Sequence, residues 1–419
     1  MFSLIKFELK KLVKKKSNIV TILVSLIVTI ILCSMNITRF EYLGIGGHST
    51  GFKAIELKKQ DAKKFPTEVT EDQVKKDIKD YQSLISNPKN TIKNEEGRVS
   101  LKDNVFLKFV YPKYDYLSMI ALNYCEPGRE SEVYNLSNLS KLKLQNGSKF
   151  YETGNNKIST FLNMDHKGGN YSDKEKKFWI NKISKVKTPY TYGYYEGWES
   201  LLTIFGTLVF TLLAIIITIA PMFAGEYQCG ADSIILSSKY GKTKIIKAKI
   251  IAAVTFATII FVLNLIFILS IPLLSFGTDG WNLPIQIKNA ITVAPYKATF
   301  LEATFMCIGI TYVVILGIVS FTLLLSAKLK TPFTVLIIQI IILFVSLFMK
   351  DGADNSFYNH ILYLLPSKAV NYDFSKYLSY SFGGVIVSLL LMRVIVYGAI
   401  GIISLPPLVR NAFRNHQVQ

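Results

Sequence analysis

The sequence predicts an α-helical polytopic membrane protein with six transmembrane helices and a large extracytoplasmic domain, α-rich or α+β, between helices 1 and 2. Composition is the first reason: half of the 419 residues are hydrophobic, only 18% are charged, and the mean hydropathy is +0.32. Such a composition excludes a disordered chain and a small disulfide scaffold. The second reason is a set of six apolar stretches, each near or above the roughly 20 residues that a helix needs to cross a hydrocarbon core of ~30 Å. They cover residues 17–37, 200–224, 250–276, 303–327, 332–349 and 382–409.

The apolar stretches are expected to be helices because lipid offers the backbone no hydrogen-bond partner. The first five contain no Asp, Glu, Lys or Arg. A single stretch of this kind would suit a buried helix of a soluble protein, but six in one chain argue against that interpretation. The first stretch follows a basic flank, as a signal peptide does. Its apolar part is longer than an ordinary signal core and no A-x-A-like site follows it, so we interpret it as a retained helix.

These stretches divide the chain into three parts. Residues 1–37 hold a basic amphipathic helix, suited to the headgroup layer, and the first span. Residues 38–198 form the extracytoplasmic domain. Residues 199–419 hold spans 2 to 6, with a cytoplasmic loop at 225–249 and an outer re-entrant segment near 361–366.

The sequence predicts two helix starts and one strand within the outer domain. Helices are expected after Thr70 and Ser172, because Gln73 and Glu175 follow them at the spacing of a capping box. Residues 105–111 are expected to form a strand.

The charge distribution predicts the topology. The net charge is +19, of which the outer domain carries +7 and the N-terminus, two short loops and the C-terminal tail carry +12. Lys and Arg accumulate in short loops on the cytoplasmic side, whereas long translocated segments are largely exempt from this rule. Both termini are therefore expected in the cytoplasm. A nucleic-acid partner is not expected, because such proteins gather their charge on a folded basic face.

The loop at 225–249 carries an apolar patch at 234–236 that a topological signal does not explain. We expect a short helix here that offers the patch to a partner at the membrane face. The tripeptide at 241–243 resembles the end of a phosphate-binding P-loop, but Leu236 stands where the first glycine should be. The four histidines are isolated. No catalytic, cofactor-binding or metal-binding residue is therefore predicted, and the chain is expected not to be an enzyme.

Arg393 lies within the predicted last span. A centred Arg costs ~2.5–3.5 kcal/mol on insertion scales, so it should face protein or water. Two interpretations stay open. Arg393 lines a pathway or pairs with a carboxylate, for which Glu302 is a poor candidate because it is expected near the outer surface, or it snorkels from a long tilted helix. The stretch at 361–365, ended by Pro366, is too short to span and suits an outer re-entrant segment.

Taken together, the basic N-terminal helix, the outer domain, the loop after the second span and the Leu-Leu-Pro segment resemble ABC-2-type permeases. These are the membrane subunits of bacterial ATP-binding cassette (ABC) exporters with a separate ATPase. The resemblance is carried by residues 221–249 and 363–367. It implies a coupling helix that docks into the ATPase and an outer segment that caps the pathway. The implied coupling residues are Glu226, Gly230, Asp232, Ile234, Ile235, Leu236 and Ser238, and the implied re-entrant residues are Tyr363, Leu364, Leu365 and Pro366.

The resemblance also implies the partners: a cytosolic ABC ATPase that holds ATP-Mg, a second permease copy or paralogue, and membrane lipid. The implied function is export of an amphipathic peptide, drug or lipid by a multi-pass protein of the bacterial plasma membrane. Two other hypotheses remain, a receptor or sensor whose outer domain binds a ligand, and an envelope or secretion scaffold. A receptor predicts a cytoplasmic output domain, whereas the largest cytoplasmic piece expected here is the loop at 225–249.

Overall fold

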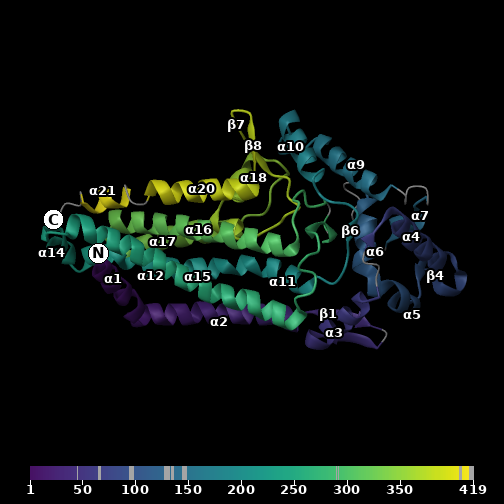
Figure 1. Ribbon diagram of the computed structural model, residues 1–419, viewed down its shortest axis with the longest axis horizontal. Helices are drawn as coiled ribbons and strands as arrows, with labels where there is room; N and C mark the ends of the chain where they lie inside the picture. Colours follow the sequence, from purple (N-terminus) through teal and green to yellow (C-terminus); the bar gives the residue numbers. More distant parts are fainter. Residues whose placement is uncertain are drawn as a thin grey trace.

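The computed structural model describes residues 1–44, 46–64, 68–93, 99–126, 133, 136–143, 149–288, 290, 292–404 and 408–414. It is an elongated, mostly helical molecule (Figure 1). Long helices run side by side in a bundle, and the polar segment that follows the first long helix forms a domain at one end of it. Both chain ends lie at the opposite end of the bundle (Figure 1).

Within the described residues, four helices are long and apolar enough to cross a membrane. They are α2 (Lys16–Thr38), a run over Glu196–Gln228, a run over Gly241–Phe276, and α16 (Phe300–Lys328). The two runs consist of α11 (Glu196–Ile204), η5 (Phe205–Thr207), α12 (Leu208–Ile219) and α13 (Pro221–Gln228), and of η6 (Gly241–Ile245) and α15 (Ile246–Phe276). These helices coincide with the first four predicted stretches and are consistent with an α-helical membrane protein.

The last two predicted stretches form shorter helices. The fifth contains α17 (Pro332–Phe344) and a final turn, η8 (Val345–Leu347). The sixth begins later than predicted, because α20 covers only Leu389–Ile403. Residues 405–407 of that stretch lie outside the described residues, and α21 (Val409–Arg414) follows them.

The predicted start of the sixth stretch was wrong because it forms a β-hairpin. Strands β7 (Ser379–Phe382) and β8 (Val385–Ser388) pair antiparallel. Gly383 and Gly384 have φ values of +56° and +94° and supply the two-residue turn that such hairpins require. The β-branched residues that follow favour a strand, so an apolar composition alone did not reveal the break.

Helix α1 (Phe2–Lys14) is separate from α2, as the sequence predicts. Lys15 is extended between them, with φ of −69° and ψ of 116°. The buried side of α1, with Glu8 and Leu12, packs on α15, whereas Phe2 and Phe7 are exposed. The helix is therefore amphipathic in the structure as well as in the sequence.

The polar domain is α-rich with small antiparallel ribbons. Its ribbons pair β1 with β2, β3 with β6, and β4 with β5. The described elements are β1 (Glu41–Gly44), β2 (Gly47–Thr50), α3 (Gly51–Ala62), β3 (Glu68–Val69), α4 (Glu71–Ser86), η1 (Pro88–Asn90), β4 (Thr91–Lys93), β5 (Val99–Leu101), α5 (Asp103–Val105), η2 (Phe106–Val110), η3 (Tyr111–Lys113), α6 (Tyr114–Asn123), α7 (Ser137–Lys141), α9 (Phe150–Asn163), α10 (Asp173–Ile183) and β6 (Tyr190–Thr191).

The strand predicted at 105–111 was wrong, since these residues form helical turns. The rings of Phe106, Tyr111 and Tyr114 pack on one another, with centroids 6.1 to 6.5 Å apart. Packing of this kind overrides the strand preference of aromatic residues.

The capping box at Ser172 is confirmed, with the hydroxyl accepting from the Glu175 backbone N–H and the Glu175 side chain accepting from the Ser172 N–H. At Thr70 only one half forms. The hydroxyl accepts from the Gln73 N–H, but the Gln73 amide donates to Asp77.

The polar domain is packed directly on the bundle. One continuous apolar core contains buried residues of both parts. The rings of Tyr195 and Phe300 stack with centroids 5.0 Å apart, and Trp198 Nε1 donates to the Thr278 carbonyl oxygen at 3.0 Å. The segment between α15 and α16, with the turn η7 (Ile285–Ile287), lies against the domain through β6. Any movement of the polar domain would therefore be transmitted to these two helices.

Candidate functional site

The loop after the second long helix forms a short helix at the end of the bundle that holds both termini (Figure 1). Gly230 turns the chain with φ of +71°, a conformation that favours glycine. Helix α14 (Ala231–Ser237) follows it. The short helix expected from the sequence is thus confirmed.

The predicted coupling residues do not share one surface. Ile234 is 74% exposed and Ser238 is exposed, whereas Ile235 is half-buried and Leu236 is only 8% exposed. Asp232 is also buried. Successive residues of an α-helix point about 100° apart, so three consecutive side chains cannot all face one partner. Ile234 is the apolar side chain of α14 that a partner would meet.

Glu226 belongs to a buried ionic cluster that joins three helices. Lys249 Nζ of α15 lies 2.6 Å from Glu226 Oε1 of α13 and 3.2 Å from Glu8 Oε2 of α1, and it donates to the Met222 carbonyl oxygen at 3.0 Å. Lys11 Nζ lies 3.3 Å from Glu8 Oε1 and 3.7 Å from Glu226 Oε1. Because Lys249 is 2% exposed, its charge depends on these carboxylates.

The cluster borders a cavity of about 150 Å³ that also contacts Lys15, Asn18, Thr218 and Pro221. Glu226 Oε2 is buried there without a hydrogen-bond partner among the described residues. Sequence analysis missed Glu8 and Lys249. A lysine in a basic flank is normally a topological signal, and nothing local distinguishes the one that is buried. The available hint was Glu8, an acid surrounded by lysines.

Gly241 permits a close approach between α14 and the start of α15. A Cβ atom at this position would lie 2.6 Å from the Ile235 carbonyl carbon, a distance that side chains do not adopt. The glycine of the P-loop-like tripeptide therefore has a packing role.

Arg393 lies in the second turn of α20 and binds the segment that was predicted to be re-entrant. Nη2 donates to the Lys368 carbonyl oxygen at 2.8 Å, Nη1 to that of Asn371 at 3.2 Å, and Nε to that of Tyr363 at 3.3 Å. The guanidinium carbon lies 5.5 Å from the centre of the Tyr372 ring. The structure thus brings together two features that the sequence presents separately.

The structure excludes two of the interpretations left open for Arg393. It does not snorkel, since it is 2% exposed. It does not pair with Glu302, which instead closes a capping box with Thr299 at the start of α16. The partners of Arg393 are backbone carbonyls 22 to 30 residues earlier in the chain, which no side-chain pattern indicates.

The predicted re-entrant segment consists of two short helices, α18 (Phe357–Leu362) and α19 (Pro366–Ala369). Tyr363 and Pro366 are buried, and Leu364 and Leu365 are half-buried between the helices. The Tyr397 hydroxyl of α20 donates to the Leu364 carbonyl oxygen at 2.7 Å. Helix α20 therefore holds the segment through Arg393 and a second donor.

A second polar cluster, centred on Asp351, lies beside this segment. Asp351 accepts from the Tyr363 hydroxyl, from Lys368 Nζ at 2.9 Å and from Lys376 Nζ at 3.1 Å. Burial by itself would raise the pKa of the Asp351 carboxyl, but these three hydrogen bonds outweigh it and hold the pKa well below its usual range.

Replacing Asp351 with asparagine is expected to lower the Tm slightly at neutral pH. A carboxyl whose pKa falls on folding adds stability above its unfolded pKa of about 3.9 and loses it as the pH drops toward the folded value. The Tm difference between D351N and the unmodified protein should be complete near about pH 6 and shrink below about pH 4. Since the Asp351 side chain is 44% exposed, solvent screening keeps the difference small. A difference that persisted undiminished at about pH 3 would argue against the ionic role.

Among the described residues, no group of three or more His, Cys, Asp or Glu side chains is placed to hold a metal ion. No family model, curated protein or solved structure matches the chain. The proposed function therefore rests on the geometry of the helix bundle and of its two ends.

Proposed function

We propose that the chain is the permease subunit of a bacterial ABC exporter of an amphipathic peptide, drug or lipid, driven by a separate cytosolic ATPase. It spans the plasma membrane six times, through the four long helices, α17 and α20. The polar domain is extracytoplasmic, and both termini and α14 are cytoplasmic. The basic residues near α1, α14 and the chain ends support this orientation.

The two short helices are compatible with spanning. The run from α17 through η8 has 16 residues, or roughly 24 Å at 1.5 Å per residue, which is less than a hydrocarbon core of ~30 Å. Helix α19 packs on α17 and η8, and Arg393 and Tyr397 of α20 donate to backbone carbonyl oxygens between residues 363 and 371. These contacts place protein beside the ends of the short helices, where the helices do not reach across the full hydrocarbon core. Irregular backbone inside the hydrocarbon core must be hydrogen-bonded by protein, as Arg393 does here.

The observation that carries the proposal is the placement of α14. Its Ile234 side chain is exposed, and the turn at Gly230 joins the helix to α13, which is tied to α1 and α15 by the Lys249 cluster. An ATPase that displaced α14 would push on three helices at once. Closing of two ATPase subunits would then move the spans of two permease copies as rigid bodies.

Replacing Ile234 with aspartate is expected to reduce copurification of the ATPase at least about tenfold, the size of effect found at the centre of an interface. The bound protein would be identified as an ABC ATPase by a complete P-loop in its mass-spectrometric sequence. Helix α14 should still fold, because the Ile234 side chain is mostly in solvent.

The matched control is Ile180→Asp, an exposed isoleucine of α10 in the polar domain. It should leave ATPase binding unchanged. Equal ATPase recovery with I234D and with the unmodified protein would count against docking at α14. Recovery of no ATPase with the unmodified protein would favour the receptor or scaffold hypothesis.

A further inference from the structure

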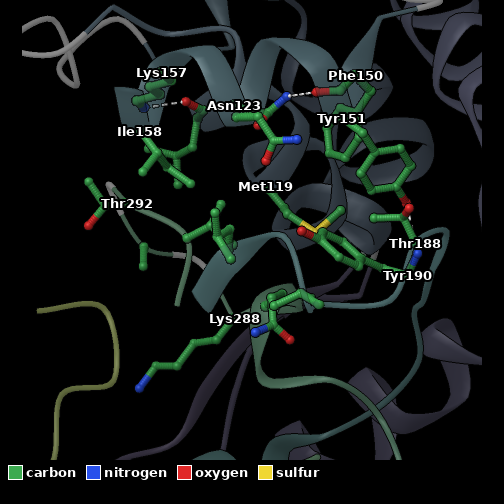
Figure 2. Close-up of a pocket in the computed structure, with 18 of the residues that line it drawn as sticks. Met119, Asn123, Phe150, Tyr151, Lys157, Ile158, Thr188, Tyr190, Lys288 and Thr292 are labelled. Atoms are coloured by element: carbon green, nitrogen blue, oxygen red, sulfur yellow. Dashed lines mark hydrogen bonds between the residues drawn. The ribbon is translucent and has the colours of Figure 1, made fainter. Parts of the chain in front are cut away.

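A cavity of about 240 Å³ lies between the polar domain and the segment that follows α15 (Figure 2). Helices α6 and α9, the end of α10 and strand β6 form its walls on the domain side, and residues 286, 288, 290, 292 and 293 contribute the other side. A molecule bound there would touch both the polar domain and the connection between two long helices.

The walls of the cavity are a mixture of polar and apolar side chains and contain no carboxylate among the described lining residues. The apolar lining includes Met119, Leu122, Phe150, Ile158, Ile183 and Val293. Two lysines are present, but both are engaged. Lys157 Nζ donates to the Leu122 carbonyl oxygen at 2.6 Å, and Lys288 Nζ lies 3.5 Å from Glu199 Oε1. A cationic ligand would find no counter-charge here.

Asn123 places an unused acceptor on this wall. Its Nδ2 donates to the Phe150 carbonyl oxygen at 2.7 Å, while its Oδ1 accepts no hydrogen bond within the described part of the chain. Gly154 of α9 makes room for this oxygen, since a Cβ atom there would lie 2.5 Å from it. Asn123 is 8% exposed, so water has limited access to it.

Tyr190 places an unused donor in the same cavity. Its ring packs against Tyr151 with centroids 5.0 Å apart, but its hydroxyl has no hydrogen-bond partner among the residues described. Burial raises the pKa of Tyr190 to about 12, so the hydroxyl keeps its proton at physiological pH. Tyr190 is 8% exposed. In Figure 2 Asn123 and Tyr190 lie on different sides of the cavity, with Met119 between them.

We propose that this cavity binds a small uncharged molecule with an apolar body and an amide group. The amide N–H would donate to Asn123 Oδ1, and its carbonyl oxygen would accept from the Tyr190 hydroxyl. A ligand that bonds to both groups is favoured over one that bonds to either alone, because each hydrogen bond adds to the binding free energy. The apolar body would lie against Met119 and its neighbours. Binding needs neither ATP nor the ATPase, so this proposal and the proposed function fail independently.

The test compares three probes that share a phenyl ring: phenylacetamide, methyl phenylacetate and phenethylammonium. Their dissociation constants would be measured by ligand-observed NMR on the full chain in lipid nanodiscs, with empty nanodiscs as the background. Phenylacetamide should bind about tenfold tighter than the ester, which has no donor for Asn123. Phenethylammonium should bind weakest, because it carries an unpaired charge into the cavity.

Tyr190→Phe should weaken phenylacetamide binding about fivefold or more without lowering the Tm, because the hydroxyl makes no bond in the fold. The matched control is Tyr171→Phe, an equally buried tyrosine outside this cavity, which should leave binding unchanged. Equal affinities for the amide and the ester, equal effects of Y190F and Y171F, or no binding above the nanodisc background would each overturn the proposal.

Discussion

Replacing Lys249 with methionine is expected to destabilise the protein by up to about 3–5 kcal/mol, because Glu8 and Glu226 would stay buried with only the half-exposed Lys11 as a counter-charge. The side chain that replaces it fills similar space, so the loss is electrostatic and not a packing defect. Thermal unfolding in one fixed detergent would measure it. The matched control is Lys247→Met on the same helix, where the lysine is exposed and the change should have little effect.

A triple variant tests whether the loss of stability comes from the unpaired carboxylates or from the absence of the lysine side chain. Combining Lys249→Met with Glu8→Gln and Glu226→Gln removes the uncompensated charges together. Most of the stability should return, because replacing a whole buried ionic cluster is often close to neutral. If the triple variant were as unstable as the single one, the cluster would not be acting through paired charge.

The cluster also predicts that a variant can regain stability and still lose the coupling between ATP hydrolysis and transport. A triple variant that regains stability no longer links α1, α13 and α15 through charge-assisted hydrogen bonds. Under the proposed function its ATPase would still bind at Ile234, but substrate-dependent ATP hydrolysis should fall. The measurement is ATPase recovery and ATP turnover on the same preparation.

Arg393→Met is expected to release the segment that contains α18 and α19. Three buried carbonyl oxygens, those of Tyr363, Lys368 and Asn371, would lose their donor, and each unsatisfied group costs about 1–3 kcal/mol. Amide hydrogen exchange over residues 363–371 should become at least about tenfold faster. Exchange in α14, at the far end of the bundle, should not change and serves as the internal control.

Arg393→Lys should restore only part of the protection. A guanidinium presents several N–H donors in a rigid fork, whereas an ammonium is a compact donor that cannot meet three spread carbonyls at once. Full protection in the lysine variant would indicate that charge alone holds the segment. Unchanged exchange in Arg393→Met would contradict the anchoring role.

Each of the two buried cations ties helices together near one end of the bundle. Lys249 ties the helices beside α14 together at one end of the bundle, and Arg393 ties α18 and α19 to α20 near the other. Helix α16 lies between them, packed on both α13 and α20. Ser326 of α16 accepts hydrogen bonds from the backbone N–H groups of Phe223 and Ala224, each at 3.0 Å. A displacement of α14 would therefore have a packed route toward the segment that contains α18 and α19.

Local sequence determined the parts of this protein that depend on local physics. Hydrophobic length places α2, the two long composite runs and α16, since crossing lipid demands a continuous apolar helix. The capping pattern at Ser172 and the short helix at 231–237 were predicted in the same way. The hairpin at 379–388 was missed because its apolar residues match a helix in composition and only the Gly-Gly turn separates the two.

Tertiary structure alone decided which polar residues matter. Lys249 and Glu8 are 241 positions apart, and Arg393 binds backbone atoms that every residue carries, so neither contact leaves a local pattern. The same holds for the cavity, whose Asn123 and Tyr190 are ordinary residues until α6, α9 and β6 bury them together. Hydropathy is a sum over neighbours in the chain, whereas the pairing of a buried charge is a property of neighbours in space.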